Sequence, residues 1–119
     1  MKQGLQEIND LVGVWGSLVC DNQGKMIAGA PPPALNDSIL ENISQHCVEL
    51  LSTAGEHLQG LEEMILYYQQ RRLFLHDLED AVLIVMCTPS IDISLLRLTV
   101  NVVLTRWESD PKIQKLLKD

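Results

Sequence analysis

The 119-residue sequence predicts an α/β (α+β) fold, in which helices cover both faces of a five-stranded, antiparallel-rich sheet. Two apolar stretches near the N-terminus flank a short polar turn, which is typical of a β-hairpin. Two longer stretches repeat apolar residues three and four positions apart, which is typical of amphipathic helices. The segment Ala81–Cys87 is apolar throughout, so we expect a central strand covered on both faces. The predicted order is α-β-β-α-β-β-β-α, followed by a short helix.

The composition fits one globular domain. Hydrophobic residues make up 46% of the chain and charged residues 21%, so a packed core is expected. The formal charge of −7 argues against nucleic acid and anionic membranes as partners. No apolar run is long enough to span a bilayer, and no secretion signal is visible at the N-terminus. Three cysteines in apolar contexts indicate a reducing compartment, so a cytoplasmic location is expected.

The first elements are a short helix and a hairpin. Leu5, Ile8, and Leu11 or Val12 recur at helical spacing. Residues 14–20 and 25–28 then form two strands. Between them, Asp21 can accept hydrogen bonds from its own turn, and Gly24 can take the positive φ of a bulged hairpin loop.

A proline-rich loop leads into the longest predicted helix, residues 36–59. Asn36, Asp37 and Ser38 are N-cap candidates, and Ser38 with Glu41 has capping-box spacing. We expect Gly60 to end the helix. The apolar stripe is broad enough to contact more than the sheet of its own chain; it is formed by Leu40, Ile43, Cys47, Leu50 and Ala54, and is widened by Ile39, Leu51 and Leu58.

Two alternating strands, 61–68 and 72–78, precede the central apolar strand. After a break at residues 88–90, one narrow polar stripe predicts a helix instead of another strand; it consists of Ser94, Arg97, Asn101, Thr105 and Glu108. Asp110 and Pro111 then begin a short helix whose apolar side carries Ile113, Leu116 and Leu117. The expected organisation is a domain over 1–108 and an amphipathic helix within 109–119 that packs on the domain or on a partner.

The sequence lacks a recognisable catalytic constellation. It has no phosphate-binding loop with a following Lys and Ser or Thr, so the chain is not expected to be a GTPase itself. His46 and His57 lie about three helical turns apart and cannot share a metal ion. Arg71 and Arg72 could supply an arginine finger, but a solubilising pair beside a turn is favoured. We therefore expect no enzyme activity, no cofactor and no metal.

The pattern G-V-x-G-x-L-V-x-D-x-x-G-x-x-x-A, which starts at Gly13, resembles the opening hairpin of the Roadblock family. That family is named for a dynein light chain and includes bacterial and archaeal regulators of small Ras-like GTPases. The later segments match in the same order: a strand, a turn at Glu79 and Asp80, the apolar strand, and a helix opening at residues 93–97. The resemblance covers nearly the whole chain.

The resemblance implies a homodimer in which the third strands, 61–68, lie side by side and the second helices, 36–59, meet across a two-fold axis. It also implies that the helices bind a small Ras-like GTPase and promote hydrolysis without donating a catalytic residue, in signalling, motility or cell polarity. A structural adaptor subunit of a larger complex is the first alternative, and a small-ligand sensor, which would need a cavity lined by convergent polar groups, is the second. The candidate interface residues are Ile43, Cys47, Leu50, Leu51, Met64, Leu66 and Tyr68.

Overall fold

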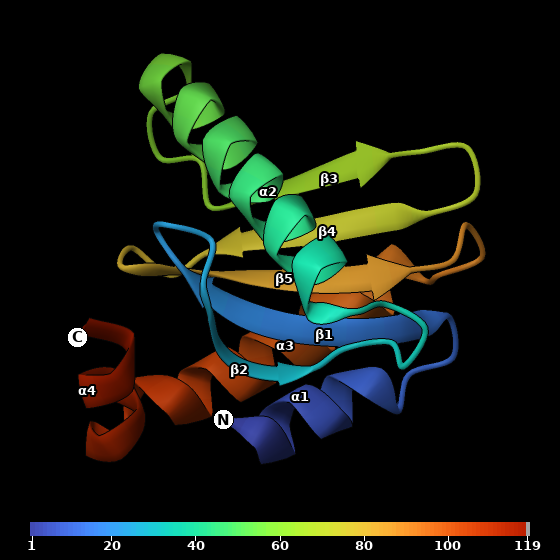
Figure 1. Cartoon of the computed structure of the whole chain (residues 1–119). Coiled ribbons are helices and arrows are strands. Elements are labelled where there is room, and N and C mark those ends of the chain that lie inside the picture. Colours follow the sequence, from blue (N-terminus) through green and yellow to red (C-terminus); the bar gives the residue numbers. More distant parts are fainter. Residues whose placement is uncertain (119) are drawn as a thin grey trace.

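The computed structural model describes residues 1–118, which form nine helices and strands (Figure 1). In chain order they are α1 (Lys2–Asn9), β1 (Val14–Asp21), β2 (Met26–Ala30), α2 (Asp37–His57), β3 (Glu63–Tyr67), β4 (Arg72–Asp77), β5 (Ala81–Cys87), α3 (Ile93–Glu108) and α4 (Pro111–Lys118).

The strands form one antiparallel sheet in the order β2-β1-β5-β4-β3. β5 lies at the centre and every one of its residues is buried, which confirms the prediction from its unbroken apolar run. Figure 1 shows β2 and β3 at the two edges.

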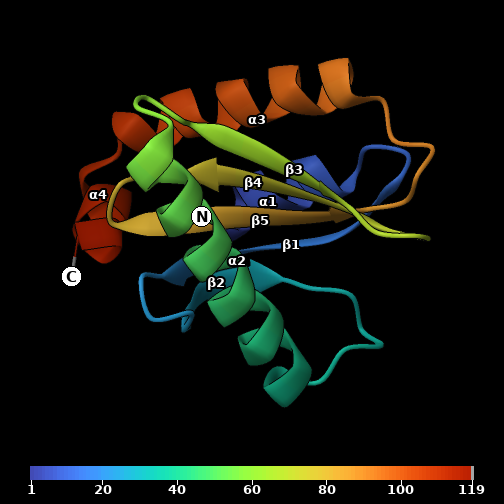
Figure 2. The ribbon, with the colours of Figure 1, turned by 90° about the horizontal axis from the view of Figure 1, so that it is seen from above.

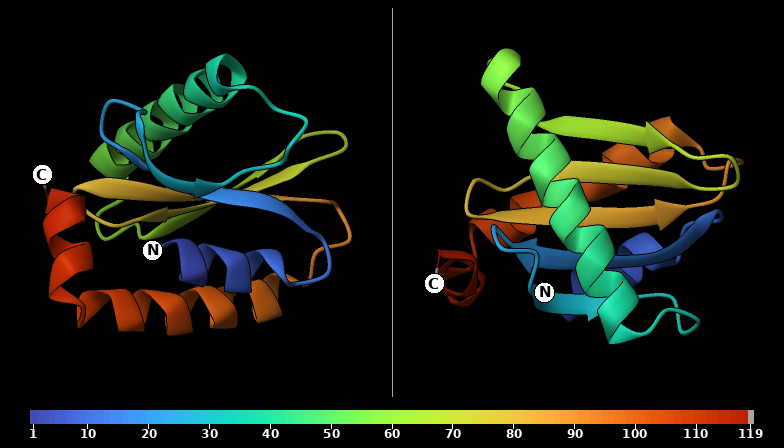
Figure 3. Two further views of the ribbon diagram at one scale, coloured as in Figure 1. Left: turned by 60° about the horizontal axis from the view of Figure 1, so that its bottom comes forward. Right: turned by 45° about the horizontal axis from the view of Figure 1, so that its top comes forward.

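The helices form a layer on each side of the sheet. α2 crosses one face diagonally, and α1 and α3 lie together on the other (Figures 2 and 3). Alternation along β3 and β4 divides their side chains between two cores: Met64 and Leu75 pack in the core under α2, and Ile65 and Phe74 pack in the core under α1 and α3. The predicted two-sided covering of the sheet is confirmed.

Local hydrogen bonds build the β1–β2 turn as its sequence predicts. The Asp21 carboxylate accepts hydrogen bonds from the backbone N–H groups of Gln23 (2.8 Å) and Lys25 (2.9 Å). Gly24 has a φ of +83°, a conformation that residues with a Cβ rarely adopt. The expected roles of Asp21 and Gly24 are therefore confirmed.

Several element ends differ from prediction; β3, for example, is Glu63–Tyr67 where 61–68 was expected. α1 ends at Asn9, and Val12 is 93% exposed because the chain turns at Gly13, whose φ is +96°. Of the three N-cap candidates of α2, Asn36 is the cap, and its side chain accepts a hydrogen bond from Ile39 N–H at 2.9 Å. The capping box of Ser38 and Glu41 does not form at this end, because Ser38 already lies inside the helix. α2 ends at His57, before Gly60, which takes a φ of +78° in the following turn.

The C-terminal helices pack against the face opposite α2. The polar stripe predicted on α3 is exposed, while Leu96, Val100 and Trp107 are buried. Leu117 of α4 is buried in the same core, and Gln114 Nε2 donates to the Trp107 carbonyl at 2.8 Å. Within residues 1–118, no helix combines the length and the hydropathy that crossing a bilayer requires.

Candidate protein-interaction site

The outer edge of β3 is the first part of the candidate site. β3 pairs with β4 on one side and with no other strand among the described residues. Met64 and Leu66 are half-buried toward α2, and Tyr67 is 70% exposed. A strand edge of this kind leaves backbone N–H and C=O groups available for pairing with another chain.

α2 forms the second part, and its residues divide between the core and the surface. Cys47 and Leu51 of the candidate interface set are buried against the sheet, so the interface proposed below leaves them out. Ile43 and Leu50 are half-buried on an adjoining side of the helix and stay in the set. Figures 1 and 3 show that the C-terminal turn of α2 extends past the edge of β3.

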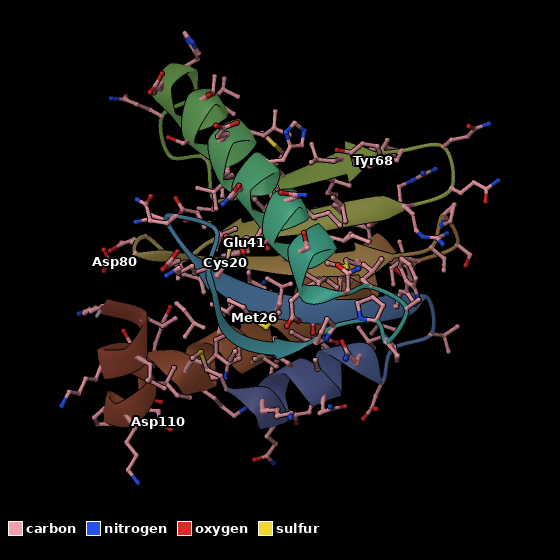
Figure 4. All side chains as sticks on the ribbon, viewed as in Figure 1. Cys20, Met26, Glu41, Tyr68, Asp80 and Asp110 are labelled. Carbon is pink, nitrogen blue, oxygen red and sulfur yellow. The ribbon has the colours of Figure 1, made fainter. Side chains whose placement is uncertain are left out.

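An apolar pocket of about 310 Å³ lies beside α2 on the same face of the sheet. Its lining comes from the start of β1, the loop before α2, α2 itself, the β3–β4 connection, β4 and β5. The lining residues are Trp15, Leu35, Ile43, His46, Cys47, Tyr68, Arg71, Leu73 and Met86. Figure 4 shows Tyr68 at the end of β3, on the side of the sheet to the right of α2.

Arg71 in the β3–β4 connection and Arg72 at the start of β4 each lie over an aromatic ring. The Arg71 guanidinium carbon is 4.3 Å from the centre of the Trp15 ring, and that of Arg72 is 4.7 Å from the Tyr67 ring. Arg72 also donates to the Tyr68 carbonyl at 2.6 Å. These contacts hold both guanidinium groups beside the candidate site, which the sequence alone did not indicate because Trp15 is remote along the chain.

The thiols in this region are poor nucleophiles and metal ligands. Burial raises the pKa of Cys20 to about 11 and that of Cys47 to about 12, so both remain protonated at neutral pH. Within residues 1–118, no three His, Cys, Asp or Glu side chains are grouped as a metal site requires. The surface offers apolar contacts and backbone pairing as its means of interaction.

A second, larger cleft of about 630 Å³ lies at the opposite end of the sheet, between the β4–β5 turn, α3 and α4. Its lining includes one lysine and the carboxylates of Glu62, Asp77, Glu79, Asp80 and Glu108. Asp80 projects outward from the β4–β5 turn in Figure 4. These like charges disfavour anionic ligands such as nucleotides at this end of the molecule.

Comparison with solved structures identifies the fold. A Roadblock/LC7 domain from Streptomyces avermitilis is 10% identical, with 91% of this chain and 94% of that chain covered and a TM-score of 0.77. The gliding protein MglB from Thermus thermophilus is 14% identical, with 85% and 80% covered and a TM-score of 0.72. MglC from Myxococcus xanthus is 12% identical, with 97% and 94% covered and a TM-score of 0.61.

No protein-family model matches the sequence, and no curated protein matches it. The likeness is therefore one of structure, extending over most of the chain in each case. The element order, the five-stranded sheet with β5 at its centre and the single diagonal helix on one face agree with it. This chain has the Roadblock/LC7 fold.

Proposed function

We propose that the chain is a non-enzymatic homodimeric regulator or scaffold that binds a small Ras-like GTPase through α2 and the dimer surface. The observation that carries the proposal is that the open edge of β3 lies beside α2. On α2, the half-buried Ile43 and Leu50 add an apolar surface next to that edge. Both features need apolar or backbone partners, and they lie on one continuous surface.

Pairing of β3 with β3 of a second copy would give the open β3 edge and the apolar side of α2 the partners that they lack. It satisfies backbone groups on both edges and joins the two sheets into one about a two-fold axis. The two α2 helices then lie side by side on the same face of the joined sheet. An interface of this kind is expected to bury about 1,200–2,000 Å² or more.

The GTPase partner is inferred from the sequence resemblance to the Roadblock family, together with the fold. The joined α2 helices offer an exposed surface that carries Glu41, Glu49 and Glu56, which suits a partner with a basic face. We infer that the dimer acts by holding the switch region of the GTPase and that it contributes no reacting group.

Capture from native lysate tests the partner. The tagged full chain is incubated with lysate in GDP and, separately, in a non-hydrolysable GTP analogue, and small GTPases are identified by mass spectrometry. We expect one GTPase to be retained preferentially in one nucleotide state. Retention of no GTPase in either state would contradict the GTPase part of the proposal, whatever the oligomeric state.

A structural adaptor is the second candidate, because the outer side of α3 presents a separate apolar stripe. Leu95, Leu98 and Val102 are each about half exposed or more on the face opposite α2. An adaptor would hold partners on both faces and would retain them equally in GDP and in the GTP analogue, so the same experiment separates the two functions.

A further inference from the structure

The apolar pocket beside α2 has no side chain filling it, although its lining is largely aromatic and aliphatic. Arg71 lies at its rim over Trp15 and makes no ion pair within residues 1–118. Open apolar surface of this kind lacks the contacts that a core side chain would supply. The pocket is therefore suited to one apolar side chain.

Leu58, the C-cap of α2, is apolar but is not buried in the core of its own copy. It follows the buried residues Leu40, Cys47 and Leu51 at spacings of seven, four and seven, so the chain leaves α2 on the same side of the helix as they lie. It is nevertheless 58% exposed, because this end of α2 extends past β3 and has no sheet beneath it (Figure 3).

Two-fold pairing of β3 edges would place these two features together. The axis would be perpendicular to the sheet at the middle of β3, and it would set α2 of the second copy antiparallel to α2. The projecting end of α2 would then be rotated from the left of Figure 1 to the right, over the β3–β4 connection of the other copy. That connection and the start of β4 supply Tyr68, Arg71 and Leu73 to the pocket.

We propose that Leu58 of each copy fills the apolar pocket of the other, and that Arg71, which lines the pocket beside Trp15, closes over it. This inference rests on the proposed dimer and adds its principal side-chain contact. The contact is reciprocal, so each dimer contains it twice. The occupant of the pocket is a second copy of this chain, and not the GTPase.

Matched substitutions on the two faces test the contribution of Leu58. Leu58→Asp is compared with Leu98→Asp, since Leu98 is 61% exposed on α3, on the opposite face. Circular dichroism checks that both variants fold, and sedimentation equilibrium gives their dissociation constants. We expect Leu58→Asp to raise the dimer Kd at least tenfold and Leu98→Asp to leave it within about twofold.

Cross-linking tests the position of Leu58 directly. The double variant Leu58→Cys with Arg71→Cys is treated with a short bis-maleimide, while Cys20, Cys47 and Cys87 are buried in the native protein. Leu58 is the C-cap of α2 and Arg71 lies between β3 and β4. Figure 1 shows the C-terminal end of α2 and the β3–β4 connection on opposite sides of one copy, so a rapid link must join two copies. We expect a product of dimer mass, and none from Leu98→Cys with Arg71→Cys.

The outcomes separate this contact from the dimer itself. A native dimer that gives no cross-link, or whose Kd is unchanged by Leu58→Asp, would overturn the pocket contact and leave the proposed function standing. A ladder of higher species would overturn the reciprocal two-fold contact, because only an open chain of copies produces it. A native protein that is monomeric at micromolar concentration would contradict both.

Discussion

Gly24 shows how one residue couples the hairpin to the helix above it. A Cβ built at Gly24 would lie 2.5 Å from Gln45 Cγ and 2.9 Å from Gln45 Cα, so the turn is packed directly against α2. Its φ was predictable because the turn is local, but this contact was not, because Gln45 belongs to a distant element. The stacking of Arg71 on Trp15 was likewise not predictable from the sequence, because these two residues are far apart along the chain.

Gly24→Ala should therefore lower the free energy of unfolding by more than Gly60→Ala. Both glycines have positive φ, but a Cβ at Gly60 would meet open space. The backbone strain is similar at the two sites, and overpacking against α2 should add about 1–3 kcal/mol at Gly24 alone. Urea denaturation measures both values, and equal losses would mean that the turn does not press on α2 in solution.

His76 gives the fold a pH dependence. Burial lowers its pKa, although Glu63, Glu62 and Asp77 act in the opposite direction. The unfolded chain therefore takes up the His76 proton at a higher pH than the folded chain does. The His76 contribution to stability is complete above the unfolded pKa of about 6.5 and is lost as the pH falls from there through the folded pKa.

We expect the free energy of unfolding to decrease more steeply between pH 7 and pH 5 in the native protein than in His76→Phe. Phenylalanine keeps a flat ring beside Phe74, whose ring centre is 6.5 Å from that of His76, and it cannot titrate. One proton corresponds to at most about 1.4 kcal/mol per pH unit. Parallel stability curves for the two proteins would rule out His76 as the titrating group.

The elements themselves were largely predictable, because periodicity and breakers are local. All four helices and five strands were expected in the right order, and the polar stripe of α3 distinguished that helix from a strand. Element ends were less predictable. The sequence offered Asn36, Asp37 and Ser38 as N-caps of α2, and Asn36 is the cap, while the capping-box spacing of Ser38 and Glu41 pointed two residues too far along the chain.

α4 is the element whose removal should be most informative. Deleting the residues after Ser109 removes Leu117 from the core and uncovers its neighbours there, which include Trp107. We expect the free energy of unfolding to fall by about 1.5–3 kcal/mol, the value of one buried leucine.

The control for this truncation is Leu116→Ser, because Leu116 is exposed on the same helix. It should leave the stability nearly unchanged. If the truncated and native chains unfold at the same urea concentration and bind partners equally, α4 contributes nothing to this domain.

The candidate site was only partly predictable at the scale of the whole molecule. The broad apolar stripe of α2 and the apolar third strand indicated a partner surface. Which stripe residues face the sheet depends on the angle at which α2 crosses it, so Cys47 and Leu51 were grouped with Ile43 and Leu50. The pocket is built from remote segments and has no signature in the sequence.

Leu66→Lys combined with Leu50→Glu should convert the dimer to monomer and abolish GTPase capture. The lysine places a charge on the β3 side of the proposed junction, and the glutamate places one between the two α2 helices. Light scattering on the native and doubly substituted chains measures the mass. Capture of the GTPase by a monomeric variant would show that binding does not need the dimer.

The pairing of β1 with β5 at the centre of the sheet has a consequence for how the chain folds. The β1–β2 hairpin and the β3–β4–β5 meander each join neighbours in sequence, but β1 and β5 meet only after the long segment between them is closed. Such non-local closure is slow. We expect this step to limit the refolding rate, so that Leu18→Ala in β1 slows refolding in stopped-flow measurements, while Tyr67→Ala at the outer edge mainly changes unfolding.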